Sequence, residues 1–509
     1  MTARRWVPNR ATGHRLLARA RHPTRRAAVL ALIAGAIVVA VALDLAGSAA
    51  APRATVPPDA GPTVPASSAV SAAWYCAEGT GSTDGRADET IWIANVGDAD
   101  ARVDITVMPG GDVEPTSRRV TVPRRGQLRV PVSSVLETAE QPDPGGTIIG
   151  PGVVVEVFGS RAIVEHEVDG QADGQRDVGV GACAREPARD WYFAAGTTER
   201  GAEQRLALFN PFADDAILDL SFATDVGFVA PADLQSLVVP RRSRVTVPVA
   251  SFVRRQPQIG AHVNVRVGRI VAEQSLVFNS ENENRRGLTL SLGATAPARS
   301  WTLPGVVAGD GVANGVFVAN FDPTATEVEI TPRFEDENGV APSRVAVPGR
   351  SAVLVDLGPL AGPGVAFDVQ VRTTGNVPVV AEGLAVWGPA AGTIGAATAV
   401  GSPQPARDWV FALGRLAAED AAAVSVFNAG PREANVKLIA YPSGSDQPAG
   451  ECELTLTARK QATFDLGELG IAPDQVIVVH ADEPVVAARR ILGPSGASLA
   501  PGIPDPHAP

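Results

Sequence analysis

The sequence predicts an all-β protein of four tandem immunoglobulin-like β-sandwich modules behind one N-terminal transmembrane helix. A motif that opens with tryptophan occurs four times, at spacings of 117, 110 and 108 residues. Between the tryptophans, short β-branched runs alternate apolar and polar positions, which is the period-two pattern of strands. A single long apolar run stands near the N-terminus, directly after a cluster of arginines.

Length and charge limit the classes of protein to consider. A chain of 509 residues is too long for one hydrophobic core and suits several domains. Of its 44 Lys and Arg and 55 Asp and Glu, eight arginines and one aspartate precede residue 45. Residues 45–509 therefore hold 36 basic and 54 acidic side chains, a net charge of −18. Because such a body repels polyanions, we expect no nucleic-acid partner.

The N-terminal segment has the features of a membrane anchor. Ala27–Leu43 is a run of 17 apolar or glycine residues, preceded by Arg25 and Arg26 and followed by Asp44. As a helix it would span about 26 Å, at the short end of a bilayer crossing. Arginines on one side only place the N-terminus in the cytoplasm. We therefore expect a basic cytoplasmic segment at 1–26, a transmembrane signal anchor at 27–44, and an extracytoplasmic remainder.

Two other interpretations of this segment stay open. A signal peptide cleaved near Ser48–Ala50 would make the protein secreted, and a buried core helix would leave it without a membrane segment. The length of the apolar run and the long basic lead favour the anchor. The Pro/Ala/Ser-rich residues 45–71 lack periodicity and predict an extended linker.

Four landmarks recur in the same order in every copy: the tryptophan, an asparagine that ends an apolar strand, a turn after Val-Pro, and a closing pair of strands. In the fourth copy Ala458 aligns with the turn proline. Each copy is long enough to bury its own core. We expect β-sandwiches at 72–187, 188–297, 298–405 and 406–502, with a tail at 503–509.

The repeated residues suggest structural roles. Each tryptophan would anchor the first strand against the core, or fill the seam with the preceding module. Each asparagine would close a turn by bonding the backbone after its strand. The tryptophans are Trp74, Trp191, Trp301 and Trp409, and the asparagines are Asn95, Asn210, Asn320 and Asn428.

The second copy reads W-Y-F-A-A-G-T, F-N-P, V-V-P, I-V-A-E-Q and S-L-G-A in order. This order resembles an actinobacterial family of membrane-anchored envelope proteins of unknown function, built from W-Y-F-A-E-G-T, N-P, V-P and V-V-A-E-R repeats. The resemblance covers about residues 72–500 and implies a location and a fold, but no activity. The glutamate of the closing strand is present as Glu273 and Glu382, while His166 and Ala488 align with it in the outer copies. A catalytic role is therefore not expected of it, and a buried pair with a neighbouring arginine is favoured.

The three cysteines predict one disulfide. Cys76 and Cys183 stand at the first and last strands of copy one, where copy two has Phe193 and Thr295. An exported chain meets an oxidising compartment, so we expect these two to be bonded. Cys452 has no candidate partner and is expected to be a free thiol. No Cys-x-x-Cys or histidine pair accompanies them, and we expect no metal site.

The sequence offers little chemistry. His166, His262 and His480 fall in separate copies, and neither G-x-S-x-G nor a phosphate-binding glycine loop occurs. We expect no catalytic residue and no cofactor. The favoured function is a non-enzymatic structural or interaction protein of the cell envelope, a membrane-anchored rod that meets cell-wall polymer or an envelope protein.

A carbohydrate-binding accessory in envelope glycan assembly or attachment is the alternative function. Trp92, which projects away from the inward aliphatic residues, would stack on a sugar ring in that case. It would otherwise face the covering sheet or the adjacent module. An enzyme comes third, since its active groups would have to converge from different modules.

Overall fold

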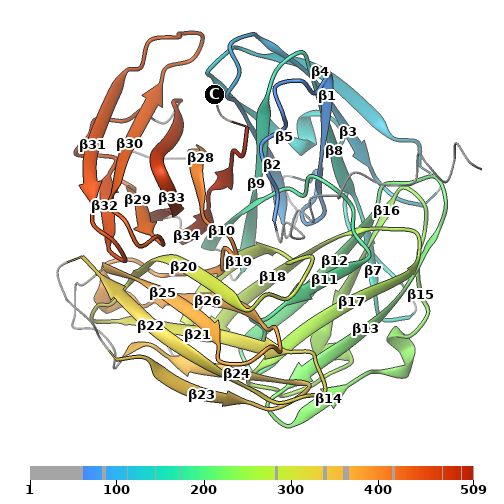
Figure 1. Cartoon of the computed structure of the whole chain (residues 1–509). Coiled ribbons are helices and arrows are strands. Elements are labelled where there is room, and N and C mark those ends of the chain that lie inside the picture. The colour runs from blue at the N-terminus through green and yellow to red at the C-terminus, as the bar shows by residue number, and fades with distance from the viewer. Residues whose placement is uncertain are drawn as a thin grey trace, which may run out of the picture. The chain divides into compact units, whose positions relative to one another are not determined.

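The computed structural model of the chain divides into two compact units, Met1–Pro58 and Asp59–Pro509. The expected anchor at 27–44 lies outside the described residues, and no helix among those described is long and apolar enough to cross a membrane. The structure (Figure 1) describes residues 61–507 except 83–86, 112, 144, 173–174, 281–284, 336–340, 359–365, 415–418, 473 and 495.

The described residues confirm the all-β class. They form strands joined by turns and by short 3-10 helices, namely η1 (Val132–Ser134), η2 (Ala232–Leu234), η3 (Val249–Ser251) and η6 (Pro389–Ala391). Repeat 1 holds β1 (Ser71–Cys76), β2 (Asp88–Asn95), β3 (Ala101–Met108), β4 (Thr116–Val122), β5 (Gln127–Pro131), β6 (Gln141–Pro142), β7 (Ile148–Gly150), β8 (Gly152–Phe158), β9 (Ala162–Ala172) and β10 (Gln175–Ala182). Repeat 2 holds β11 (Asp190–Phe193), β12 (Ala202–Asn210), β13 (Ala216–Thr224), β14 (Gly227–Val229), β15 (Leu237–Val239), β16 (Ser243–Pro248), β17 (Ile259–Val267), β18 (Val271–Ser280) and β19 (Arg285–Leu292).

The other two repeats are built from comparable strands. Repeat 3 holds β20 (Ser300–Val307), β21 (Val312–Asn320), β22 (Thr326–Phe334), β23 (Ser343–Val347), β24 (Ser351–Asp356), β25 (Ala366–Thr373), β26 (Val380–Trp387) and β27 (Gly395–Val400). Repeat 4 holds β28 (Ala406–Ala412), β29 (Ala421–Asn428), β30 (Ala434–Tyr441), β31 (Gly450–Leu456), β32 (Gln461–Asp465), β33 (Val476–Gly493), β34 (Gly496–Pro501) and β35 (Ile503–Pro504). The predicted tail is therefore not separate, because β35 pairs with β28.

Each repeat contributes two layers of strands around one core. In repeat 1 the sheets run β1-β8-β3-β4 and β10-β9-β2-β5. Trp74, Val103 and Val155 from the first sheet share a buried cluster with Ile91 and Ile163 from the second. Repeat 3 has the same orders, β20-β25-β22-β23 and β27-β26-β21-β24. This is the sandwich-like arrangement that alternating apolar residues dictate, because each sheet has one face to bury.

The recurring asparagines close turns in all four repeats. Asn95 Oδ1 accepts a hydrogen bond from Gly97 N at 3.0 Å, while its Nδ2 donates to Ala99 O at 2.8 Å and Val122 O at 3.2 Å. Asn210, Asn320 and Asn428 repeat this pattern. Each buried amide thereby joins the end of its strand to the turn that follows Val-Pro.

The Val-Pro turn itself carries an arginine in the left-handed region in every repeat, at φ values of 52°, 50°, 55° and 64° for Arg125, Arg242, Arg350 and Arg459. Arg459 takes the place of Arg125, and Asn428 bonds the carbonyls of Leu456 and Thr457 as Asn95 bonds those of Val122 and Pro123. Thr457, and not Ala458, therefore stands where the other repeats have proline.

The expected rod is wrong, because the last repeat packs against the first. The strands β10, β19, β27 and β34, which we call the hub, contact one another in a closed cycle that returns from β34 to β10. The labels of β10, β19 and β34 lie near the middle of Figure 1. Gly126 of repeat 1 forms a β-bridge with Gln475 of repeat 4, and Val410 and Ala412 lie in the core cluster of repeat 1. The four repeats of the second unit thus close on themselves.

Candidate functional site: the buried contacts that join the repeats

A buried glutamate from one repeat binds the backbone of the repeat before it. Glu273 of β18 accepts a hydrogen bond from Glu78 N of repeat 1 at 2.7 Å. Glu382 of β26 accepts from Ala194 N and Ala195 N of repeat 2 at 3.2 and 2.9 Å. Both carboxyl groups are fully buried. The donors follow the repeated tryptophan by three or four residues, so the contact falls on the repeated motif W-Y-F-A-A-G-T.

A contact of the same kind joins repeat 1 to repeat 4. Glu165 of β9 accepts a hydrogen bond from the Ala412 backbone of repeat 4 and another from Arg489 Nη1 at 3.0 Å. Trp92 pairs with Glu165 in the register in which Phe317 pairs with Glu382, so Glu165 is the repeat-1 counterpart. The motif alignment that placed His166 there was wrong by one residue. The expected partnership of this glutamate with an arginine holds at Glu165 alone of these three, and the arginine is Arg489 from another repeat.

Repeat 4 lacks the glutamate and has Ala488 in its place. The donor it would satisfy, Gly305 N of repeat 3, instead bonds Asp368 Oδ1 at 2.8 Å, and Ser425 Oγ of repeat 4 donates to the same oxygen at 3.2 Å. At each of the four junctions, a buried carboxylate therefore accepts a hydrogen bond from the backbone of an opening strand. At the junction of repeats 3 and 4 this carboxylate is Asp368 of β25, and not a glutamate of the closing strand. Asp368 lies in the closing pair of strands, but the matching positions in repeats 1, 2 and 4 are Gly152, Gly260 and Val476, so comparison of the copies does not point to a carboxylate there.

These carboxyl groups are held in unusual protonation states. Burial raises the pKa of Glu382 to about 7, against the lowering effect of its hydrogen bonds from Ala195, Ser291 and Ala194. Burial likewise raises the pKa of Asp368 to about 7, against the bonds from Gly305 and Ser425. Near neutral pH both groups therefore exist partly as neutral acids.

We expect Glu382→Gln to make the protein more stable at pH 8 and to leave it unchanged near pH 4. The folded state keeps the Glu382 proton until about pH 7, whereas the unfolded chain releases it near the ordinary glutamate value, so stability falls as pH rises between the two. The gain in free energy of unfolding should reach about 3 kcal/mol at pH 8. Denaturant unfolding across this pH range measures it, with exposed Glu114→Gln as the control. An equal stability of Glu382→Gln and wild type at pH 8 would contradict the prediction.

His166 forms a second buried cluster at the seam between repeats 1 and 2. Its Nδ1 lies 2.9 Å from Glu89 Oε1 and its Nε2 lies 3.2 Å from Glu273 Oε2, and all three side chains are at most 2% exposed. Burial opposes a charge on the ring, but the two carboxylates outweigh it and raise the pKa of His166 to about 10. The imidazole is therefore a cation between two acids. Because Glu89 belongs to repeat 1 and Glu273 to repeat 2, the ring links the two repeats across their buried seam.

One group of side chains among those described has the spacing of a metal site. Ligand atoms of Cys76, His166 and Cys183 lie within 4.8 Å of one another. The two sulfurs are joined in a disulfide, which confirms the predicted bond. An oxidised pair offers no thiolate, so these residues do not fit a metal ion.

The disulfide joins the two sheets of repeat 1, and in repeats 2 and 4 a phenylalanine packed over a glycine takes its place. Tyr75 bridges Ala184 as Tyr192 bridges Ala294, so Cys183 corresponds to Gly293 and not to Thr295. A Cβ atom added at Gly293 would lie 2.7 Å from the ring of Phe193, the counterpart of Cys76. The pair Phe411 and Gly502 repeats this packing in repeat 4. Cys452, in contrast, is a half-buried free thiol.

A further buried cation joins repeats 1 and 2. Arg244 of β16 is fully buried and donates from Nη1 to Gly79 O at 2.7 Å and to Ala77 O at 3.1 Å. Its Nη2 donates to Glu140 Oε1 at 2.5 Å, and Arg205 Nη1 donates to Glu140 Oε2 at 3.2 Å. Arg244, Arg489 and Asp368 were not predicted, because each has a partner in a neighbouring repeat and no local pattern marks it.

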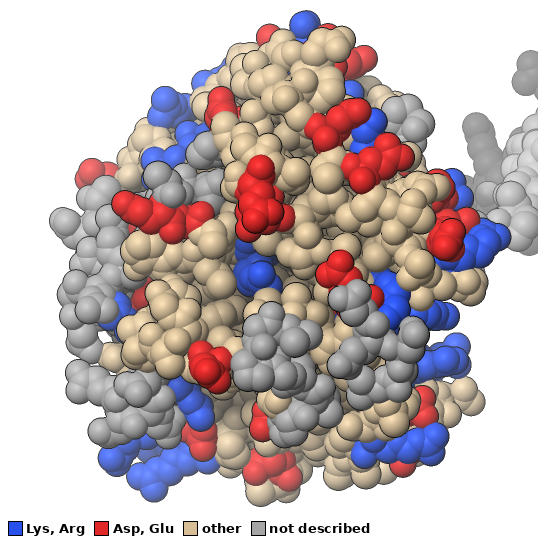
Figure 2. Space-filling view, turned by 90° about the vertical axis from the view of Figure 1, so that its left-hand side faces the viewer, with Lys and Arg blue, Asp and Glu red and all other residues tan. Residues whose placement is uncertain are grey.

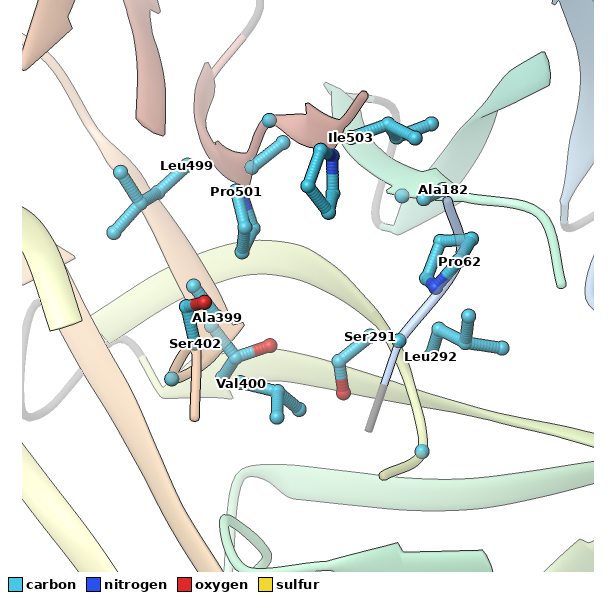
Figure 3. Close-up of a pocket in the computed structure, with 18 of the residues that line it drawn as sticks. Pro62, Ala182, Ser291, Leu292, Ala399, Val400, Ser402, Leu499, Pro501 and Ile503 are labelled. Atoms are coloured by element: carbon cyan, nitrogen blue, oxygen red, sulfur yellow. The ribbon is translucent and has the colours of Figure 1, made fainter. Parts of the chain in front are cut away.

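A pocket of about 130 Å³ lies where the four hub strands end. Figure 3 shows Ala182, Ser291, Ala399 and Leu499, one residue from each hub strand, around its opening. Pro62 of the segment that leads into repeat 1 forms one wall. The described lining is mostly aliphatic and proline side chains, with hydroxyl groups at Thr63, Ser291, Thr398 and Ser402. It can accept a small apolar group but presents no acid, base or nucleophile beyond these hydroxyls.

The four tryptophans predicted as anchors and Trp92, predicted as a sugar-stacking residue, are all buried. All four repeated tryptophans are at most 1% exposed and each belongs to the core of its own repeat. Three of them donate their indole N–H to a backbone carbonyl within the closing pair of strands. Trp191 donates to Ile270, Trp301 to Val379 and Trp409 to Val485. Trp92 is also buried, at 8% exposure, and its Nε1 lies 3.3 Å from Glu167 Oε2. A ring this covered does not fit the role of a sugar-stacking platform.

The comparisons with known proteins identify a family. The profile of a family of unknown function (DUF5719) matches residues 158–397 and 284–499, which together make up more than half of the chain. The chain belongs to this family. No curated protein matches the sequence. The second of the two matches begins about one repeat after the first, as expected for a repeating chain.

Solved structures give only distant likenesses. Thermotoga maritima 1070 is 20% identical over 21% of this chain and 93% of its own, with a TM-score of 0.19. The FN1–FN3 domains of chicken CNTN1 are 10% identical, with coverages of 62% and 97% and a TM-score of 0.09. A tetra-tandem repeat from the extending region of a large adhesion protein is 12% identical, with coverages of 86% and 100% and a TM-score of 0.10. None of these scores supports an argument about this chain.

Proposed function

We propose that this protein is a non-enzymatic structural or interaction protein of the bacterial cell envelope, tethered by residues 27–44 with its repeats outside the cytoplasm. Each repeat would be an immunoglobulin-like sandwich, with two sheets around one core. The observation that carries the proposal is the cyclic set of buried contacts, from Glu273 through Glu382 to Glu165 and Arg489. Polar groups buried in this way fix the relative positions of four repeats, which suits a rigid surface for binding.

Two further observations favour this function over catalysis and over sugar stacking. His166 pairs with Glu89 and with Glu273, and all three side chains are buried. The disulfide suits an oxidising compartment outside the cytoplasm. The carbohydrate-binding alternative loses Trp92 as its stacking residue and would need another surface.

Labelling in intact cells tests the location. Val226 is 78% exposed, so Val226→Cys should react with a membrane-impermeant maleimide added to whole cells. The full chain should sediment with membranes, and deletion of residues 1–44 should abolish this. Labelling only after lysis would overturn the extracytoplasmic placement. Two further experiments distinguish the kinds of partner. Cosedimentation of the full chain with insoluble envelope polymer would indicate a polymer partner, and capture of an envelope protein by cross-linking would indicate a protein partner.

A further inference from the structure

An arginine-rich hollow lies on repeat 3 where it meets repeat 4. Its volume is about 730 Å³, and it lies over the exposed face of the sheet β20-β25-β22-β23. Its described lining holds four arginines and one acid, namely Arg299, Arg333, Arg372, Arg459 and Glu329. Residues 45–509 carry a net charge of −18, so this local excess of positive charge opposes the character of the whole body.

The fold does not require these arginines. Strand register places Arg372 opposite Ser300, and the matching positions in repeats 1, 2 and 4 are Glu156, Asn264 and His480. It places Arg333 opposite Asp368, and the matching positions are Met108, Ala223 and Tyr441. The basic residues are therefore particular to repeat 3. At these two positions no other repeat has an arginine or a lysine, so the sandwich forms without a guanidinium group there.

The turn arginine of repeat 4 has different surroundings from those of repeats 1 and 3. Arg125 of repeat 1 lies 4.9 Å from the ring of Tyr441 in repeat 4, and Arg350 of repeat 3 lies 5.3 Å from the ring of Phe228 in repeat 2. Their counterpart Arg459 lines the hollow together with Arg333. Burial lowers the pKa of Arg333, and the like charge of Arg459 lowers it further. Two cations facing each other across a seam repel, unless an anion lies between them.

The one acid of the described lining does not neutralise the pair. Glu329 accepts a hydrogen bond from Arg344 Nη2 at 2.8 Å. Arg333 Nε donates to the neutral amide of Gln370 at 3.0 Å, and Arg299 Nη1 donates to Asn376 at 3.3 Å. Basic side chains lie in a recess near the middle of the face in Figure 2, between areas that bear acidic ones. The guanidinium groups thus retain donors for a ligand.

We propose that this hollow binds an oxyanion, a phosphate or a carboxylate carried by a polymer. Arg333 and Arg459 would hold it between them, with Arg372 at the rim, because planar guanidinium groups bond such oxyanions in pairs. Ser300 and Thr331 supply neutral hydrogen-bonding groups beside them. The hollow is open and larger than a single ion, so the anionic group belongs to a longer molecule. That the polymer belongs to the cell envelope rests on the proposed function, whereas the binding of an oxyanion does not.

Titration calorimetry of the full chain in detergent tests this, with inorganic phosphate and glucuronic acid as probes and glucose as the neutral control. We expect saturable binding of one of the two acids, weakened by added salt. Arg333→Gln with Arg459→Gln should weaken it at least about tenfold. Arg119→Gln, on the corresponding sheet of repeat 1 and paired with Asp104, should leave it unchanged. The acid that binds indicates whether the polymer carries phosphate or carboxylate groups.

Stability separates lost binding from lost folding. Because the double variant removes a like-charge contact, it should melt no lower than the wild type in the absence of probe. If it does melt lower, the single variant Arg372→Gln on the exposed rim takes its place, with the same expected weakening. Absence of binding by the wild type, or unchanged binding by the variants, overturns the proposal. Since maleimide labelling of Val226→Cys reports location alone, either proposal can fail while the other stands.

Discussion

Replacing Arg489 by alanine should destabilise the protein by roughly 3–5 kcal/mol, because it leaves the fully buried carboxylate of Glu165 without its cation. Burial already raises the pKa of Glu165, and Arg489 acts against that rise. The pair lies between the last repeat and the first. Hydrogen–deuterium exchange should therefore increase in β9 and β33 but not in β21 and β22 of repeat 3.

The double variant Glu165→Leu/Arg489→Met separates the cost of an unpaired charge from the value of the pair. Arg489 Nε and Nη2 and Glu165 Oε1 have no hydrogen-bond partner among the described residues, so the pair recovers only part of its desolvation cost. Apolar residues of similar size should then be neutral or stabilising relative to wild type. As the control, Arg432→Ala, which breaks an exposed pair with Glu483, should leave the exchange pattern unchanged. If Arg489→Ala and the double variant lost equal stability, packing and not charge would explain the contact.

The sequence predicted features that depend on neighbours along the chain. Strands follow from period-two alternation. The asparagine turns follow from an amide whose nearest partners lie two and four residues ahead. The disulfide was also predictable, because both cysteines stand at the ends of one repeat whose first and last strands meet. Such features need no knowledge of how one repeat sits on the next.

The closure of the four repeats could not be predicted in this way. The donor to Glu165 is Ala412, in another repeat, and the donor to Glu273 is Glu78. A repeat motif shows that the copies are alike but says nothing of the angle between them, so a rod and a closed arrangement fit the same sequence. The one-residue slip at His166 has a related cause. In a strand of alternating residues, Glu-His-Glu can be aligned two ways, and only the strand register decides which side chain shares the face of Glu273.

The candidate site depended on residues that break the repeat. Asp368, Arg489 and Arg333 each stand where the other repeats have something else, and each faces a neighbouring repeat. Comparison of the copies emphasises what they share, which here is the sandwich and its turns. Departures from the repeat mark where the four copies take different roles, and they became interpretable only once strand register placed them side by side.

Loss of the Cys76–Cys183 disulfide should destabilise repeat 1 by about 4–5 kcal/mol, since it closes a loop with a sequence separation of 107 residues. Cys76→Ala/Cys183→Ala should therefore raise hydrogen exchange in β1 and β10, with repeats 2 to 4 as the internal reference. Both cysteines are fully buried, so the alanines also leave a cavity. Reductant should produce a similar change in the wild type and none in the variant.

The other repeats suggest a second variant that isolates the covalent contribution. Phe193 over Gly293 and Phe411 over Gly502 fill the same place without a bond, so Cys76→Phe/Cys183→Gly should restore the packing while leaving the loop open. We expect its protection to lie between those of the wild type and the alanine variant. Protection equal to the wild type would show that repeat 1 needs the volume and not the covalent link. Protection as low as that of the alanine pair would show that the link itself holds the two sheets together, because the packing of repeats 2 and 4 could then not substitute for it.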